Sequence, residues 1–163
     1  MNHVELFSGI GGFRQELNLI QKDFNIPFNC IAFSEIEKNA ITTYKANYDT
    51  TGEIEMGDIV AFNSNEDNIR NLHFDLLTGG FPCQPFSMMG DQLGFSDTRG
   101  TMFFEIEKIL RVKKEQGEQI PFVVLENVRN LYTHDKGNTF RTIKEHLENL
   151  GYHFFSSIFN TEN

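Results

Sequence analysis

The stretch Gly79-Gly80-Phe81-Pro82-Cys83-Gln84-Pro85-Phe86-Ser87 constrains this chain more than any other. It follows the run Phe74-Asp75-Leu76-Leu77, which predicts a strand. We expect the two glycines to let the backbone turn, and the prolines around the Cys-Gln dipeptide to keep the loop stiff. Open α/β sheets bind ligands outside the carboxyl ends of their strands, so this cysteine is well placed for chemistry. A buried structural cysteine is the ordinary alternative, and the proline frame argues against it.

The N-terminus predicts a nucleotide-binding unit. A strand over His3 to Phe7 leads into Ser8-Gly9-Ile10-Gly11-Gly12 and then into a helix with an apolar stripe at Phe13, Leu17, Ile20 and Phe24. Glycines allow close backbone approach, and the helix N-terminus offers free N–H groups. Glu35 ends a second strand, Phe28 to Ser34, roughly 20 residues after the loop, where an acid holds ribose hydroxyls. It is equally suited to the N-terminus of the next helix.

The remaining pattern alternates strands and helices, which predicts a doubly wound, mostly parallel α/β sheet in one domain over residues 1–163. Gly57-Asp58-Ile59 follows a brief strand, and Asp58 suits either an adenine amino group or an ordinary turn. Residues 88–100 predict a mobile lid with glycine hinges. The other predicted elements are a helix over Ile36 to Tyr48, strands over Glu53 to Met56 and His73 to Leu77, a polar segment over Asn63 to Asn71 that begins as a loop, a helix over Thr101 to Gln116, a central strand over Phe122 to Leu125, a helix over Asn138 to Leu150 and a last strand over Tyr152 to Phe159.

Composition narrows the class of protein. Two cysteines form no disulfide framework, which fits a cytoplasmic protein, and Cys30 is expected in the core. The histidines lack metal-ligand spacing, and neither a signal peptide nor an apolar membrane span is apparent, so we expect no metal and no membrane. The net charge of −9 is unusual for a nucleic-acid enzyme and predicts that any DNA-reading surface is small or lies on other polypeptide.

Taken together, the motifs resemble those of the DNA cytosine-C5 methyltransferases. They stand in that family's order across almost the whole chain: Phe7-Ser8-Gly9-Ile10-Gly11-Gly12, Glu35, Gly57-Asp58, Phe81-Pro82-Cys83-Gln84, Asp97-Thr98-Arg99-Gly100 with Phe103-Phe104, Glu126-Asn127-Val128, and Leu150-Gly151-Tyr152. The resemblance implies a Rossmann-like fold with S-adenosylmethionine as cofactor. It also implies methylation of duplex DNA in a bacterial or phage restriction-modification system.

By this resemblance, the glycine loop would approach the amino-acid end of the cofactor. Phe7 would pack on the adenine, Glu35 would hold the ribose, and Asp58 with the Ile59 N–H would meet the adenine edge. Ile36 stands where the family often has an aromatic residue, so that stacking contact is weaker. The full set implied to bind cofactor is Phe7, Ser8, Gly9, Ile10, Gly11, Gly12, Glu35, Ile36, Asp58, Ile59, Gly80, Pro82 and Met102.

The resemblance also assigns the chemistry. Cys83 would add as a thiolate to C6 of a flipped-out cytosine, and Glu126 would protonate N3, for which burial would have to raise its pKa. Asn127 would fix the loops. Residues implied to contact DNA or the target base are Phe81, Gln84, Ser87, Met89 and Arg99.

The family pattern stops before its next motif, a Gln-x-Arg-x-Arg segment, and before the target-recognition domain. The seventh strand of the fold is therefore expected to be missing, leaving the segment near Phe154 to Phe159 frayed, mispaired or swapped. A second polypeptide would then supply recognition, and the chain alone is expected to be inactive. Three other functions stay open: an RNA cytosine-C5 methyltransferase, a non-catalytic cofactor-binding or assembly subunit, and a dinucleotide dehydrogenase.

Overall fold

The computed structural model describes residues 1–82 and 102–159. These fall into two compact units, the first made of residues 1–81 and 108–126 and the second of residues 82–107 and 127 onward. The lid predicted over residues 88–100 lies outside the described residues.

The first unit is built on a parallel sheet with the strand order β3-β2-β1-β4-β5. The order runs outward from β1 to β3, and the chain then crosses back to continue with β4 and β5. The point between β1 and β4 is therefore a topological switch point, where ligands bind in open α/β sheets. The strands are β1 (Asn2–Leu6), β2 (Asn29–Phe33), β3 (Ile54–Glu55), β4 (Leu76–Gly80) and β5 (Phe122–Glu126).

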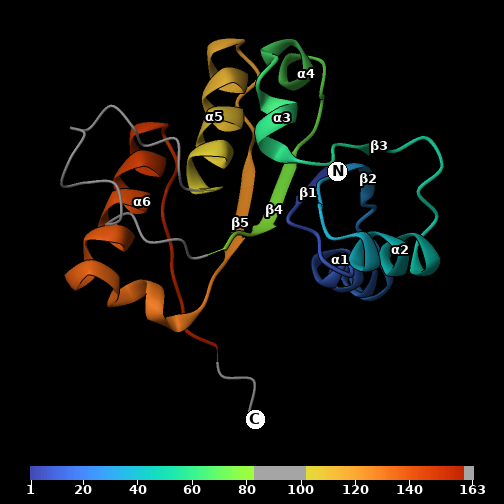
Figure 1. Cartoon of the computed structure of the whole chain (residues 1–163), viewed down its shortest axis with the longest axis horizontal. Coiled ribbons are helices and arrows are strands. Elements are labelled where there is room, and N and C mark those ends of the chain that lie inside the picture. Colours follow the sequence, from blue (N-terminus) through green and yellow to red (C-terminus); the bar gives the residue numbers. More distant parts are fainter. Residues whose placement is uncertain (83–101, 160–163) are drawn as a thin grey trace. The chain divides into compact units, whose positions relative to one another are not determined.

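Helices follow the strands in sequence, as right-handed parallel crossovers require. The reversal of strand order sends α1 and α2 to one face of the sheet and α3 and α4 to the other (Figure 1). Buried Val4, Leu6 and Leu77 supply the apolar core at the centre of the sheet. The helices are α1 (Gly12–Phe24), α2 (Lys38–Asn47), α3 (Ile59–Asn63), α4 (Glu66–Arg70) and α5 (Met102–Glu115), the last running from the second unit into the first.

The second unit centres on α6 (Asn138–Asn149), which follows two short 3₁₀ turns, η3 (Arg129–Tyr132) and η4 (His134–Gly137). Aromatic rings hold it together. His146 of α6 meets Phe103 and Phe104 edge-on at centroid distances of 6.2 and 5.2 Å. Phe140 packs on Tyr132 at 4.5 Å and on Phe154 at 5.6 Å.

The predicted last strand is absent from the described residues. Residues 152–159 have no regular secondary structure, and Phe155 is 90% exposed. Within this single chain the segment is unpaired, as one of the three expected outcomes has it, and its assignment as a strand is wrong because no described strand pairs with it. The same absence leaves β5 at the edge of the described sheet, not in the centre as its continuous apolar run predicts, with Phe122 and Val124 about half exposed.

Two other boundaries differ from the sequence prediction. The polar segment predicted to begin as a loop contains α4, because Asn65 caps it by accepting the Asp67 N–H at 3.1 Å. The fourth strand begins three residues later than predicted and continues through Gly79 and Gly80, which do not turn the chain. Gly79 pairs with both β1 and β5, and Gly80 pairs with β5, so both glycines stay extended within the strand.

Neither a helix long and apolar enough to cross a membrane nor a group of three or more metal-ligand side chains occurs within residues 1–82 and 102–159.

Candidate functional site

The loop after β1 has an unusual backbone. Phe7, Gly9 and Gly11 all have positive φ, of 52°, 53° and 95°. Glycine adopts this region freely, but for a bulky residue such as Phe7 it is a strained outlier, and strain of this kind clusters at functional sites. Sequence reasoning did not find this strain, because the residue type gives no sign of it.

Glu35, which follows β2, is hydrogen-bonded to this loop, which follows the neighbouring strand β1. Its Oε2 accepts the Gly9 N–H at 2.8 Å, and its Oε1 accepts the N–H groups of Ile36 and Glu37 at 2.8 and 2.9 Å. Glu35 also lies just before α2, which begins at Lys38, although the residue that caps this helix is Glu37. The carboxylate is therefore held beside the glycine loop, as a cofactor-binding acid would be.

The loop leaves polar groups and space open. The Ser8 Oγ is buried without a hydrogen-bond partner among the described residues, and no atom lies within 4 Å of where a Cβ on Gly9 or Gly12 would stand. Among the residues that the structure describes, no side chain caps the N-terminus of α1. These features suit a ligand with a carboxylate or other polar end, because the first N–H groups of a helix attract negative charge.

Three further strand ends reach the same edge of the sheet. Asp58 follows β3 and caps α3 by accepting the Val60 N–H at 2.9 Å, and the Ile59 side chain is buried. Gly80 and Glu126 end the paired strands β4 and β5, and Phe81 after β4 is buried. Asp58 thus has a local backbone role of the kind named as its alternative.

The remaining candidate residues are exposed, belong to the second unit or lie outside the described residues. Ile10 and Ile36 are exposed, at 61% and 73%. Glu126 is also exposed, so the described residues do not bury its side chain. Pro82, Met102 and Asn127 belong to the second unit. Outside the described residues lie Cys83, Gln84, Ser87, Met89 and Arg99.

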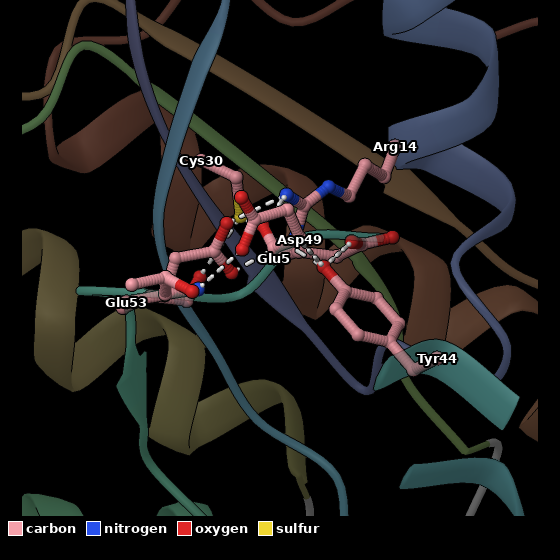
Figure 2. A network of polar contacts seen from close by, with 8 residues as sticks. Glu5, Arg14, Cys30, Tyr44, Asp49 and Glu53 are labelled. Atoms are coloured by element: carbon pink, nitrogen blue, oxygen red, sulfur yellow. Dashed lines mark hydrogen bonds and ion pairs between the residues drawn. The ribbon is translucent and has the colours of Figure 1, made fainter. Parts of the chain in front are cut away.

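Behind the loop, a buried polar cluster links β1, α1 and α2 (Figure 2). The Tyr44 hydroxyl donates to Glu5 Oε2 at 2.8 Å and accepts from Arg14 Nη1 at 3.1 Å. Arg14 also forms a two-pronged ion pair with Glu53, at 2.6 and 2.9 Å. Sequence reasoning missed this cluster, although a glutamate in the middle of an apolar strand is a visible sign that a partner exists.

Burial sets the titration of this cluster. Desolvation raises the pKa of Glu5 to about 7, against the lowering effects of Tyr44 and Arg14. It also raises the pKa of the Cys30 thiol to about 11, with the Glu53 charge adding to the rise. His3, which lies 2.7 Å from Thr78 Oγ1, has its pKa lowered to about 4 by burial and by Arg14. The prediction that Cys30 lies in the core is only partly confirmed, because the residue is of intermediate exposure.

A pocket of about 450 Å³ lies next to the cluster, lined by Arg14, Cys30 and Glu53 among others. It also includes Asn29, the first residue of β2, and Gly52, which precedes β3. It therefore opens at the amino ends of these strands, away from the glycine loop, and contains none of the predicted site residues.

Comparisons with known proteins agree with the motifs. A family model described as C-5 cytosine-specific DNA methylase matches residues 1–163. The chain is 44% identical over 152 residues to the Type II methyltransferase M.HgiCI of Herpetosiphon aurantiacus, covering 93% of this chain and 33% of that protein. It is 45% identical over 156 residues to M1.ScrFI of Lactococcus lactis subsp. cremoris, covering 96% and 36%.

A solved structure shares the fold. A mutant of Spodoptera frugiperda DNMT2 superposes with a TM-score of 0.60 at 22% identity, covering 91% of this chain and 41% of that one. The chain thus spans about a third of the length of the curated relatives named above.

Proposed function

The chain belongs to the C-5 cytosine-specific DNA methylase family, and we propose that it supplies the cofactor-binding and catalytic part of an enzyme that methylates C5 of cytosine in DNA. The observation that carries the proposal is the hydrogen bond from the Gly9 N–H, in the strained glycine loop after β1, to the Glu35 carboxylate. Family membership removes the dinucleotide dehydrogenase from the open alternatives. The Type II names of the relatives support a role in a restriction-modification system.

S-adenosylmethionine fits the residues present. Its methyl group on a sulfonium is an electrophile ready for transfer to carbon. The unpartnered Ser8 hydroxyl and the uncapped start of α1 suit its amino-acid end, while Glu35 suits its ribose hydroxyls. Asp58 and the Ile59 N–H follow β3 at the same edge and would hold the adenine edge. Phe7, Ile10, Gly80, Pro82 and Met102 complete the proposed set.

Cys83, Glu126 and Asn127 are the proposed catalytic residues. Cytosine C5 is a poor nucleophile, and addition of the Cys83 thiolate to C6 makes the ring electron-rich at C5. The lone pair that forms the Cys83–C6 bond displaces electrons toward N3, which Glu126 protonates. C5 would then bond to the methyl carbon, and the bond from that carbon to the sulfonium sulfur would break to leave a neutral thioether. Loss of the C5 proton to water, expulsion of the Cys83 thiolate and return of the N3 proton to Glu126 then restore the aromatic ring. Asn127 holds its own loop by accepting the Val128 N–H at 2.9 Å.

The target base must leave the duplex to reach Cys83, because a stacked base is inaccessible from a protein surface. Phe81, Gln84, Ser87, Met89 and Arg99 are the proposed contacts to the flipped cytosine and the DNA around it. The net charge of −9 indicates that most of the phosphate-binding surface lies on polypeptide beyond these residues. We therefore assign sequence recognition to a region or partner corresponding to the rest of the relatives' length.

A covalent trap tests this function. Duplex DNA containing 5-fluorocytosine is mixed with the protein and S-adenosylmethionine, and the intact mass is measured. Fluorine at C5 cannot leave as a proton does, so the enzyme stalls with DNA attached. We expect the adduct to be lost in Cys83→Ala and kept in Cys30→Ala, which removes the only other thiol.

The same experiment separates the other functions. If the chain forms an adduct only after a polypeptide with the proposed recognition region is added, the assignment of sequence recognition to that region is supported. An adduct with 5-fluorocytosine RNA but not DNA identifies an RNA enzyme. Cofactor binding without an adduct on either nucleic acid, even in the presence of the recognition polypeptide, identifies a non-catalytic subunit.

A further inference from the structure

Tyr48 lies against the glycine loop from the far end of α2. It is the residue after the last one of that helix, and its backbone N–H donates to the Tyr44 carbonyl at 3.0 Å. The Tyr48 hydroxyl donates to the Gly11 carbonyl oxygen at 2.8 Å. The same oxygen accepts the Gln15 N–H at 3.0 Å, the first hydrogen bond of α1. Tyr48 thus bonds the loop at the point where the loop becomes helix.

The ring of Tyr48 makes a second contact at the same position. A Cβ placed on Gly11 would overlap the Tyr48 ring, and it would lie 3.1 Å from the Tyr44 ring. Gly11 also has a φ of 95°, which side-chain-bearing residues rarely adopt. Its backbone conformation and the close approach of the tyrosine rings therefore both require glycine at this position. Tyr48 makes the closer of the two ring contacts.

The buried polar cluster braces Tyr48 in turn. The Arg14 guanidinium lies 4.8 Å from the centre of the Tyr48 ring and 5.4 Å from that of Tyr44. The two tyrosine rings are themselves 5.0 Å apart. Arg14 is fixed by its ion pair with Glu53 and by a bond to the Asp49 carbonyl at 3.0 Å. A cation that packs against both rings limits how far Tyr48 can move.

We propose that Tyr48 is a positioning residue that sets the conformation of the glycine loop for cofactor binding. Glu35 holds one end of the loop through Gly9, and Tyr48 holds the other through Gly11. With both ends fixed, the open space at Gly9 and Gly12 is preformed, so the cofactor does not have to order the loop when it binds. This inference rests on the proposed function, because the loop is assigned there to S-adenosylmethionine.

The test compares Tyr48→Phe with the wild-type protein. The variant keeps the ring and loses only the hydroxyl, so we expect a dissociation constant for S-adenosylmethionine raised roughly three- to tenfold, the size of one hydrogen bond. Thermal stability should change little. Tyr132→Phe is the matched control, since the described contact of Tyr132 with Phe140 is made by the ring, and it should bind cofactor as the wild type does.

A second readout needs no ligand. Amide hydrogen exchange at Gly9 to Phe13 should speed up in Tyr48→Phe while exchange in β1 and β4 stays unchanged. If wild-type protein does not bind the cofactor, the proposed function fails, and the exchange rates still decide the role of Tyr48. Unchanged exchange together with unchanged affinity overturns the inference alone.

A double-mutant cycle tests the ring. Gly11→Ala should weaken cofactor binding strongly in the wild type, where the added methyl meets Tyr48. In a Tyr48→Leu background, the same change should cost measurably less, because only the backbone strain and the Tyr44 contact remain. Equal effects in the two backgrounds would contradict a direct role for the ring.

Discussion

Gly80 and Glu126 face each other on adjacent strands, and a Cβ on Gly80 would lie 2.9 Å from the Glu126 Oε2. Glu126 is exposed, so its side chain has room to move away from an added methyl. We therefore expect Gly80→Ala to leave the fold stable and to displace the carboxylate proposed to act on cytosine N3. The expected result is a fall in methylation rate of about tenfold or more, measured with a cytosine-containing duplex at saturating cofactor.

Gly79 provides the matched control for this prediction. A Cβ there would lie 3.3 Å from the Leu6 carbonyl oxygen and 3.4 Å from the Leu6 Cβ, inside the sheet. These atoms belong to a packed strand and cannot give way cheaply. Gly79→Ala should therefore lower the melting temperature, whereas Gly80→Ala should not. The reverse ranking would show that the Gly80 environment is structural.

The carboxyl group of Glu5 makes stability depend on pH. Burial raises its pKa from 4.5 to about 7 in the fold, so between these pH values the folded state binds a proton that the unfolded state has lost. Stability from this group is full below pH 4.5 and falls until the pH passes about 7, a loss of about 3 kcal/mol at most. Glu5→Gln keeps the neutral shape and should remove this contribution, which urea denaturation of the wild type should show above pH 6.5, beyond the range of His3.

His3 acts in the opposite direction. Burial lowers its pKa from 6.5 to about 4, so the fold favours the neutral ring, and stability is lost as the pH drops through this range. The two slopes offset each other where they overlap, and the wild-type profile should be nearly flat there. In Glu5→Gln, the rise in stability with pH that His3 causes should become visible. His3→Gln should instead expose the fall that Glu5 causes.

The two thiols should differ in reactivity. Burial raises the pKa of Cys30 to about 11, so almost none of it is thiolate near neutral pH. We expect brief treatment with iodoacetamide at pH 7.5 to leave Cys30 unmodified in the folded protein and to label it after denaturation in urea. Peptide mass spectrometry reads out each cysteine separately. Rapid labelling of Cys30 in the folded state would contradict its burial among Glu53, Arg14 and Tyr44.

The order of strands and helices could be predicted from the sequence because apolar runs and glycine punctuation are local signals. The strand end at Gly80 could not, since what keeps it extended is pairing with Glu126 of β5, far away along the chain. The position of β5 at the edge of the described sheet depends on which strands pair with it, and this pairing cannot be predicted from the residues of β5 themselves.

The candidate site divides in the same way. Glu35 and the glycine loop could be predicted because their spacing follows the β-α-β unit. The contacts of Tyr48, Arg14 and Glu53 could not, since no short motif connects a helix end, a helix start and a loop before β3. The strain at Phe7 is also hidden in the sequence, because it comes from the backbone path that the sheet imposes.

Lys113 of α5 is fully buried in an otherwise apolar helix face, so its contribution to stability can be tested. Its Nζ donates to the Leu72 carbonyl at 2.6 Å and to Glu118 at 2.8 Å, and so closes the turn after α4 onto α5. Lys113→Met fits the same space but leaves the buried Leu72 carbonyl without this donor, so we expect a loss of about 2 kcal/mol in the free energy of unfolding. Urea denaturation at pH 7 measures it.

The exposed ion pair between Lys45 and Glu55 is the control for this loss. Water replaces the partner of an exposed charge, so Lys45→Met should change the free energy of unfolding by less than about 1 kcal/mol. If both lysine variants lose the same amount, the charge and not the buried carbonyl is responsible. A larger loss in Lys113→Met alone would assign the stabilisation to the buried position of Lys113 and its bonds to the Leu72 and Arg70 carbonyls, which the exposed Lys45 pair lacks.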